Sequence, residues 1–409
     1  MAYWAKAPVD RSQLVLFAHK LDDAIGEDPP VRLLDEMLAE ADGSPWENAY
    51  CGAAGQPAIH PRVMAGAILY GLTVGLRTSR GQERSGSRLP KELANLKKRQ
   101  EALRRALSAA READARRIAR GESKKGPAKV PVADPDAVVM PNKEGGHAPN
   151  YTPLVAADGA AGIIVDADVL AEPNELGATV PMVERIEETF GAKPKQLLAD
   201  SNHGTGANLE KLEQAGVEAY IPVEGQETPA SVRREDGSVA VTESEWPNLP
   251  RSPQTKKLDK SAFLYDKEKD CYWCPSGRRL AYESTMRQER AGGEAVYRIY
   301  ACEGCAGCPL SGECLSKQAK RRSVARDQHE GRREAMRARL TSPEGRAVYR
   351  RRAPLVEGTI GVMKAVLGMR QFLLRGIQNV KTEWFWACTA FNLRKLTCAL
   401  RARTAAAGL

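Results

Sequence analysis

Hydrophobic and polar positions follow different patterns along the chain, and each pattern predicts a different kind of region. Residues 14–40 carry apolar side chains at helical spacing, and residues 60–84 are predicted to form a buried helix followed by a basic turn. In residues 88–120 leucines recur at steps of three, four and seven, the stripe of a helix that packs against another helix. We interpret this segment as a helical hairpin arm or a self-association helix, followed by a linker over 121–135.

From residue 150 onward the pattern changes to short strands and helices. The predicted order is a β-hairpin over 151–169, a helix over 182–191, a strand over 195–200, a helix over 206–216 and a strand over 217–223. Such alternation indicates an α/β core. Residues 225–262 are polar and rich in proline, which predicts a loop insertion, and residues 341–400 are predicted to be helical again.

Length and charge narrow the class of protein. A chain of 409 residues is too long for one simple core and predicts two or three domains. The net charge of +9 favours a nucleic-acid partner, and the basic runs are spread over residues 97–99, 116–120, 320–322 and 350–352. No apolar run is long enough to span a bilayer and the first residues contain no signal-peptide core. We therefore expect a soluble, cytoplasmic protein without a membrane partner.

Three acidic residues are candidates for chemistry. Asp200 ends a predicted strand, where ligands bind in α/β sheets, although an aspartate there often only caps the next helix. Glu357 lies in the first turn of a helix beginning near Pro354, among arginines and lysines without acidic partners nearby. This setting suits a metal-binding carboxylate held against a polyanion, and the helix dipole alone would also favour it. Asp158 precedes a glycine, which is typical of a β-turn.

Cysteines form a second candidate site. Six of the nine lie within forty-four residues, as Cys271-x-x-Cys274, Cys302-x-x-Cys305-x-x-Cys308 and Cys314. In a cytosolic protein this spacing favours structural Zn²⁺ over disulfides. Six thiols exceed the four that one zinc needs, so two are spare or two metals share sulfurs. We favour an insertion that zinc merely holds folded over a dedicated DNA reader. The remaining apolar candidates for the core are Cys51, Cys388, Cys398, Trp384, Phe385, Trp386 and Phe391.

A resemblance to a known family strengthens the case that these acidic residues have a functional role. The matching residues near the C-terminus are Tyr349, Arg352, Glu357, Lys364, Gly368, Arg370, Phe372, Arg375, Gly376, Glu383, Asn392 and Leu393. With the segment around Asp200 and the motifs of residues 60–84, they make the chain resemble bacterial insertion-sequence transposases of the DDE class. Two details differ from that family. One extra residue separates Arg352 from Glu357, and Ser201-Asn202-His203 replaces the usual Gly-Tyr after the second acid.

The resemblance implies an RNase H-like (retroviral-integrase-like) α/β core with a helical N-terminal domain and a Cys-rich insertion. It implies DNA strand cleavage and transfer with Mg²⁺ or Mn²⁺, with Asp200 and Glu357 as metal ligands. Asp158 is the remaining candidate for the first acid, but we place its interpretation as a β-turn residue ahead of a catalytic role. The partner would be the double-stranded terminal inverted repeats of an insertion sequence, bound by a possible homodimer, and the phosphate-binding residues would be Tyr349, Arg352, Lys364, Arg370 and Arg375. The expected divisions are residues 1–84 (N-terminal domain), 85–130 (arm and linker), 131–262 (first part of the core), 263–320 (Cys-rich insertion) and 321–409 (C-terminal helices).

The family's first acid is not identifiable in this chain. It normally lies on a strand before the hairpin, in an Asp-Gly-Thr-like motif, but here the N-terminal segment ends at Glu83-Arg84 and the charged helix begins at once. This indicates an internal deletion. Two alternatives therefore stand beside an active enzyme: a catalytically dead DNA-binding remnant or repressor, and a zinc-stapled structural or interaction protein without a DNA role.

Overall fold

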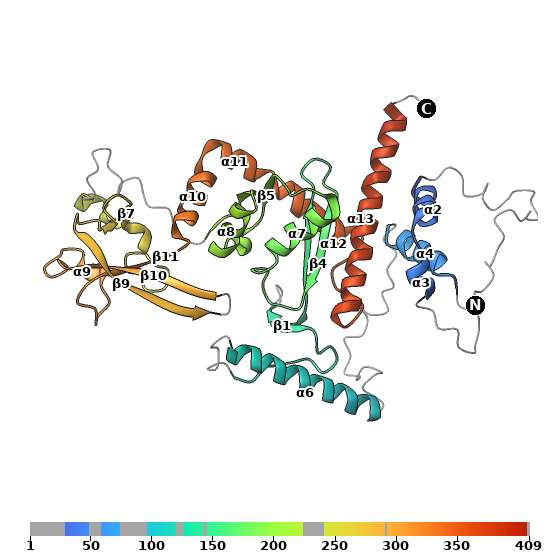
Figure 1. The fold of residues 1–409 in the computed structure, drawn as a ribbon, viewed down its shortest axis with the longest axis horizontal. Helices are drawn as coiled ribbons and strands as arrows, with labels where there is room; N and C mark the ends of the chain where they lie inside the picture. The colour runs from blue at the N-terminus through green and yellow to red at the C-terminus, as the bar shows by residue number, and fades with distance from the viewer. Residues whose placement is uncertain are drawn as a thin grey trace, which may run out of the picture. The chain divides into compact units, whose positions relative to one another are not determined.

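The computed structural model describes residues 29–48, 59–73, 96–119, 126–141, 145–223, 241–290 and 293–406. The chain divides into two compact units. Figure 1 labels their helices and strands. Unit 1 is Met1–Arg111, Lys129–Asn174 and Arg351–Leu409, and unit 2 is Glu112–Ala128 and Glu175–Arg350. The predicted helical residues before 29, Cys51, and the basic turn after 73 with its transposase-like motifs lie outside the described residues.

Helices of unit 1 meet in a small apolar cluster. The helices α2 (Pro29–Glu40), α4 (Pro61–Thr73) and α13 (Ile377–Ala406) pack through Leu34, Leu69 and Leu393, and α3 (Ser44–Asn48) lies between the first two in sequence. The helix predicted from residue 60 is present, but the prediction that it is buried is wrong. Only Ala65 and Leu69 are buried, while the outward face of α4 is exposed at Val63, Met64, Ile68 and Tyr70.

Two hairpins and the last helices complete unit 1. The strands β3 (Thr152–Ala157) and β4 (Ile164–Leu170) pair antiparallel, which confirms the predicted hairpin, and β1 (Val138–Pro141) pairs with β2 (His147–Asn150). The β3–β4 hairpin packs against α13, and α12 (Gly358–Ala365) joins their core through Met363.

The residues of α13 that were expected in the core differ in their burial. Trp384 and Phe391 are buried, as predicted. Phe385 is 44% exposed and Cys398 is exposed, so the prediction that these two lie in the core is wrong. Cys388 is buried. The helical period explains the difference, because Phe385 follows a core position by one residue and so faces about 100° away from it.

The α/β part of unit 2 follows the predicted order of elements. It contains α7 (Thr179–Phe190), β5 (Gln196–Leu198), α8 (Gly206–Gln214), β6 (Glu218–Tyr220), α10 (Glu330–Thr341) and α11 (Pro343–Arg350). β5 and β6 are parallel neighbours. Their core is an apolar cluster that includes Val183, Leu212, Ile221 and Met336. The mixture of helices and strands predicted from the sequence is confirmed.

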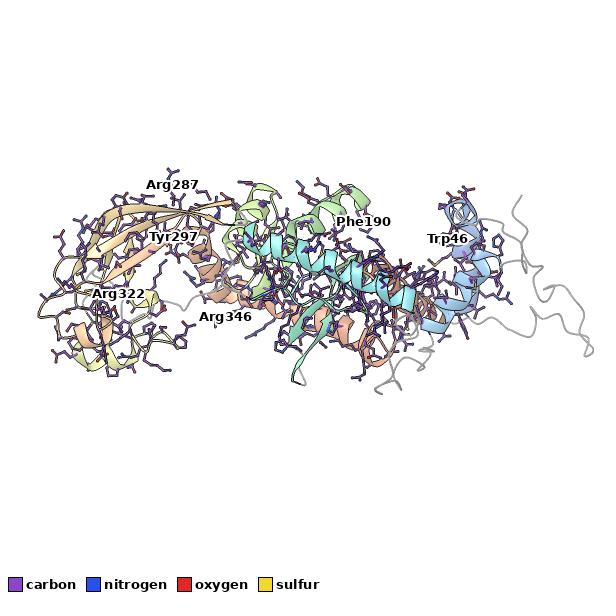
Figure 2. All side chains as sticks on the ribbon, turned by 90° about the horizontal axis from the view of Figure 1, so that it is seen from below. Trp46, Phe190, Arg287, Tyr297, Arg322 and Arg346 are labelled. Carbon is purple, nitrogen blue, oxygen red and sulfur yellow. The ribbon has the colours of Figure 1, made fainter. Side chains whose placement is uncertain are left out.

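The rest of unit 2 is a five-stranded antiparallel sheet in the order β11-β10-β9-β8-β7. Its strands are β7 (Leu264–Asp266), β8 (Cys271–Trp273), β9 (Arg279–Arg290), β10 (Gly293–Cys302) and β11 (Ser323–Asp327), with the short helices η4 (Glu243–Asn248), η5 (Lys260–Ala262) and α9 (Ser311–Cys314). Arg287 on β9 and Tyr297 on β10 project to opposite faces of the long hairpin (Figure 2), as expected because side chains alternate along strands.

Part of the predicted loop insertion belongs to the core of this sheet. Val241, Leu249 and Leu258 are buried in the same apolar cluster as Tyr272 and Tyr300. The interpretation of residues 241–258 as a polar loop is therefore wrong. The apolar residues there are spaced too widely for a helix or a strand, so no period reveals that they are buried.

The charged segment forms one long helix, α6 (Leu96–Ala119). Ala102 and Ala106 are its buried residues, whereas Leu103 and Leu107 of the predicted leucine stripe are 48% and 54% exposed. Leu89 and Leu93 lie outside the described residues. Among the helices that the structure describes, none combines the length and the apolar character needed to cross a membrane.

Candidate metal centre

Asp200 lies at the carboxyl end of the parallel strand pair in unit 2. The crossover from β5 to β6 contains η2 (Ser201–His203) and α8. In a crossover of this kind the loop after the first strand lies at the edge of the sheet where ligands bind. The Asp200 carboxylate also accepts a hydrogen bond of 2.9 Å from the Asn202 amide and caps η2. Asp200 therefore follows the end of a strand and also caps the next helix, the two positions that the sequence suggested.

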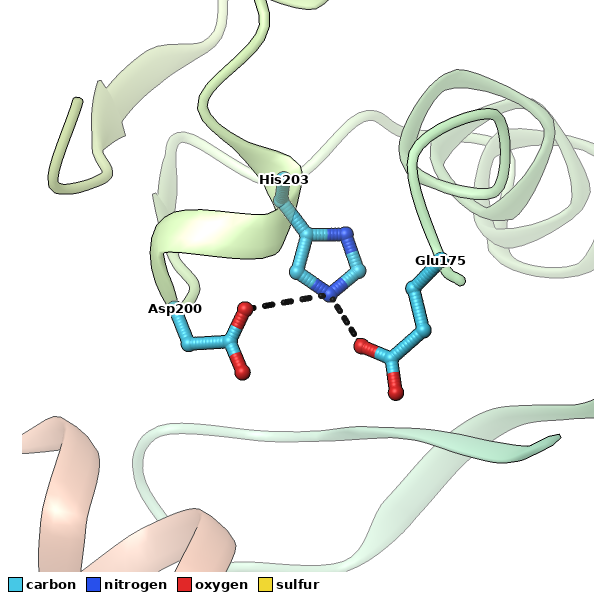
Figure 3. A group of neighbouring side chains, drawn as sticks. All are labelled: Glu175, Asp200 and His203. Atoms are coloured by element: carbon cyan, nitrogen blue, oxygen red, sulfur yellow. Dashed lines mark ion pairs between the residues drawn. The ribbon is translucent and has the colours of Figure 1, made fainter. Parts of the chain in front are cut away.

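Two further side chains with ligand atoms stand beside Asp200. Figure 3 shows Glu175 and His203 turned toward the same space as Asp200. His203 Nε2 lies 3.0 Å from Glu175 Oε2 and 3.9 Å from Asp200 Oδ1. Within the described residues, these are the only three acidic, histidine or cysteine residues whose ligand atoms all lie within 4.8 Å of one another. The Asp200 side chain is 41% exposed, so the group is open to solvent on that side.

Buried polar groups hold the His203 ring in place. His203 Nδ1 lies 2.8 Å from Thr179 Oγ1. Asn208 donates to the same Thr179 oxygen at 3.3 Å and to the carbonyl oxygens of Leu176 and His203 at 2.8 and 3.0 Å. Thr179 and Asn208 are both buried. The Nδ1 side of the ring is therefore fixed by the fold, and Nε2 faces the two carboxylates.

This donor set can serve a divalent cation. Two carboxylates and one imidazole nitrogen are ligands that Mn²⁺ and Mg²⁺ accept. Bonds of about 2.1 Å place neighbouring ligands about 3 Å apart, and the contact between His203 and Glu175 already has that length, 3.0 Å. A ligating His203 would donate its Nδ1 proton to Thr179, as metal-bound imidazoles do to outer groups. With the proton on Nε2 instead, His203 and Glu175 form a hydrogen-bonded pair without an ion.

Glu357 lies in unit 1, at the end of the π-helical turn η6 (Ala353–Glu357) that leads into α12. Its side chain is 68% exposed, and Glu357 Oε1 lies 3.7 Å from Arg352 Nη2. An exposed contact of this length contributes little to stability, so the carboxylate remains accessible to a cation. π-Helical turns occur frequently at functional sites.

Asp158, also in unit 1, stabilises the turn between β3 and β4. Its Oδ2 accepts hydrogen bonds from the amides of Ala160 and Ala161 at 3.0 and 2.6 Å. The Asp158 main chain pairs with Ile163 and Gly162 and closes the β3–β4 hairpin. The geometry matches the turn interpretation, and the candidacy of Asp158 as first acid gains no support from it.

The basic residues named for DNA differ in exposure. Lys364, Arg370 and Arg375 are exposed in unit 1, whereas Arg352 is half-buried there and Tyr349 is half-buried in unit 2. Lys381, a further basic residue of this region, is engaged within its own unit. Its Nζ forms an ion pair of 2.7 Å with Asp168 Oδ1 on β4, so Lys381 neutralises a carboxylate of unit 1.

Five of the six clustered cysteines line one cavity of about 20 Å³ in unit 2, namely Cys274, Cys302, Cys305, Cys308 and Cys314. Cys271 is buried on β8 and is absent from its lining. All six are free thiols. Burial raises the pKa of the Cys302 and Cys314 thiols to about 11, so both are protonated at neutral pH when no cation is bound.

Comparisons with known families agree with the candidate chemistry. A family described as "Transposase DDE domain" matches residues 273–397, a range that contains Glu357. A family described as "Transposase domain (DUF772)" matches residues 19–87. Both matches support an insertion-sequence DDE transposase. Neither range contains Asp200, and no curated protein and no solved structure matches the chain.

Glu175 and His203 are the residues that sequence reasoning missed. His203 had a signal, because it stands in the turn where the family usually has Gly-Tyr. Glu175 had none, since its segment shows no period and lies twenty-five residues before Asp200. Only the packing of α7 against α8 brings it near the end of β5.

Proposed function

We propose that this chain is the transposase-like protein of an insertion sequence, and that it cleaves and transfers DNA strands by metal-assisted phosphoryl transfer. The observation that carries the proposal is Asp200 at the end of β5 beside two more ligand groups, in a chain whose transposase match contains Glu357. We further propose an RNase H-like core and the five divisions expected from the sequence. The ion would be Mg²⁺ or Mn²⁺, in line with the family.

In the proposed reaction, a water molecule or a 3′-hydroxyl attacks a phosphodiester phosphorus. The attacking oxygen loses its proton as a new P–O bond forms, the bond to the leaving 3′-oxygen breaks, and that oxygen takes up a proton. A bound divalent ion supplies positive charge for the developing oxyanions. Asp200 and Glu357 would hold such ions with their carboxylates. Arg370, Arg375 and Lys364, all exposed, would hold the DNA backbone, with Arg352 and Tyr349 assisting.

A nicking assay tests this function. The substrate is a supercoiled plasmid that carries the genomic segment enclosing the gene, incubated with the protein and Mg²⁺ or Mn²⁺. We expect nicked and linear products that disappear in Asp200→Asn and in Glu357→Gln. Asp158→Asn is the matched control and should retain cleavage, because an asparagine can still accept the amide bonds of Ala160 and Ala161. Undiminished cleavage by Asp200→Asn would refute the proposed role of that acid.

A second candidate function is a DNA-binding remnant or repressor that no longer cuts. Two observations favour it. The first acid is not identifiable, and the described strands of the expected core do not pair into a single sheet. Among the described strands, β3–β4 and β5–β6 each form a separate two-stranded sheet, and no segment with the expected first strand is identifiable before them. This alternative predicts duplex binding without nicking in the same assay. A zinc-stapled protein without a DNA role would show neither.

A further inference from the structure

The thiols around the cavity in unit 2 come from three separate segments. Cys274 follows β8, Cys305 and Cys308 belong to the loop after β10, and Cys314 ends the short helix α9. The cavity of about 20 Å³ has room for one ion or one water molecule. Cys271 lies three residues before Cys274, yet β8 directs it elsewhere, because it is fully buried and does not line the cavity.

Two tight turns present a sulfur to the cavity together with an amide donor. In the first, Gly277 donates to the carbonyl oxygen of Cys274 at 2.8 Å, and the Arg278 amide donates to Cys274 Sγ at 3.3 Å. In the second, Cys308 donates to the carbonyl oxygen of Cys305 at 3.2 Å, and the Arg322 amide donates to Cys305 Sγ at 3.4 Å. Amide donors stabilise sulfur in its anionic form, the form that binds metals.

Glycines make both turns possible. Gly277 has φ of 77° and Gly307 has φ of 68°, in the left-handed region that side chains with a Cβ rarely adopt. The cavity also has a positive complement, because Arg278 and Arg322 line it. The guanidinium of Arg322 keeps one buried nitrogen, Nε, without a hydrogen-bond partner. A thiolate-rich centre is an acceptor that would compensate such a donor.

We propose that Cys274, Cys305, Cys308 and Cys314 bind one Zn²⁺ ion as a tetrahedral four-thiolate centre. Each thiol releases its proton on binding, and no oxidant or reductant takes part. Cys302 is the spare thiol of the cavity. It lies within β10, where its amide donates to the carbonyl oxygen of Arg322 at 2.9 Å, so the sheet holds its backbone while the four ligands sit in turns and a short helix.

Binding requires the thiols to close around the ion. Zn–S bonds of about 2.3 Å place tetrahedral sulfurs about 3.8 Å apart. Among the described residues no three cysteine sulfurs lie within 4.8 Å of one another, so the side chains must rotate inward. Cys274 and Cys305 can rotate in this way because both stand in turns on the cavity wall, outside the strands. The ion would then join β8, the loop after β10 and α9 into one core.

Metal content of the purified full-length protein tests the proposal. We expect one zinc per chain, and Co²⁺ exchanged into the protein should give the intense visible absorption and thiolate charge transfer of four tetrahedral sulfurs. Cys274→Ser and Cys314→Ser should each reduce zinc content at least tenfold after dialysis against a mild chelator. Cys271→Ser and Cys302→Ser are matched controls that should keep the full zinc content.

Each outcome decides the proposal. A wild-type protein that neither carries zinc nor takes up Co²⁺ overturns it, and so does loss of zinc from Cys302→Ser with retention in Cys314→Ser. Should Cys274→Ser fail to fold, the charge-transfer intensity of the Co²⁺-substituted wild-type protein still counts the thiolates, and fewer than four contradicts the ligand set. DNA cleavage enters none of these measurements, so the zinc centre and the proposed function fail or stand separately.

Discussion

His203 lies in the turn where this chain differs from the Gly-Tyr that the family usually has after its second acid. We predict that His203→Ala reduces Mn²⁺ affinity at least 10-fold, because it removes the nitrogen that faces Glu175 and Asp200. Thr179→Val should lower Mn²⁺ affinity roughly 10-fold, because Thr179 orients the His203 ring and loss of such orienting groups weakens metal binding. Calorimetric Mn²⁺ titration of the wild type and variants measures both. His147→Ala, at an exposed histidine of unit 1, is the control, and equal affinity in all three variants would rule out a metal centre at His203.

Glu330 allows a prediction about pH. Burial alone would raise the pKa of this carboxyl, but Lys260 and Arg333 outweigh burial and lower it to about 2. Glu330 accepts from Lys260 at 2.6 Å and from Arg333 at 2.8 Å. Since the folded pKa is depressed, its stabilising effect is present above the unfolded value of 4.5 and is lost as pH falls toward about 2.

Accordingly, Glu330→Gln should lower the free energy of unfolding by about 3 kcal/mol at neutral pH, because Lys260, Arg333 and Arg337 each lose an ion-pair partner. Urea unfolding should show the difference between wild type and variant shrinking below about pH 4. Glu268→Gln, at an exposed position of the same unit, should change stability by less than about 0.5 kcal/mol. A pH-independent difference would exclude the ionised Glu330 as the source of stability.

At this scale the sequence reveals single residues only where a local rule applies. Asp200 was found because a strand ends there, and the turn at Asp158 because glycine follows it. Glu175 could not be found, since its position beside Asp200 depends on the packing of α7 against α8. The pairing of Lys381 with Asp168 was missed for the same reason, because the partners are 213 positions apart, 381 minus 168.

Among the elements, η6 explains a detail that the sequence left open. The family pattern has one residue fewer between its arginine and its glutamate than this chain has between Arg352 and Glu357. The structure has a π-helical turn over Ala353–Glu357. A π turn holds one residue more per hydrogen-bonded ring than an α turn, so the extra residue is absorbed without ending the helix. The spacing predicted an anomaly at this place, but not its form.

The helix α6 supports a prediction about self-association. Leu103 and Leu107 lie one turn apart on it and are about half exposed. If the leucine stripe pairs two copies of the chain, Leu103→Glu with Leu107→Glu should convert dimer to monomer in sedimentation experiments, because charged groups are excluded from such a seam. Arg105→Glu, elsewhere on the exposed surface of α6, should leave the mass unchanged. If the wild-type protein sediments as a monomer, the leucine stripe does not form a dimer interface.

For the whole molecule, the sequence predicted which elements exist better than how they combine. The order of strands and helices from 152 to 223 is as expected, because period and turn residues are local signals. The five-stranded sheet was not predicted, since the sequence of the Cys-rich region was interpreted through its thiols rather than its strands. Its core also takes Val241 and Leu249 from a segment without regular spacing. No short stretch of sequence indicates long-range packing of this kind.

The transposase assignment leads to a prediction about DNA binding that holds whether or not the chain still cuts. Each phosphate contact contributes about −0.9 to the slope of log affinity against log salt concentration. Arg370→Gln with Arg375→Gln removes two exposed cations near Glu357 in sequence. We expect the double variant to bind duplex DNA more weakly and with a slope smaller by roughly 2. Fluorescence anisotropy over a range of KCl concentrations measures the slope.

The control for this experiment must remove the same charge elsewhere. Lys267→Gln with Lys317→Gln neutralises two exposed lysines of unit 2, and we expect it to leave the slope near its wild-type value. A non-cleaving protein with a steep wild-type slope that falls only in the arginine variant would favour the DNA-binding remnant. A flat wild-type slope would instead favour the zinc-stapled protein, because binding driven by phosphate contacts must weaken as counterions accumulate.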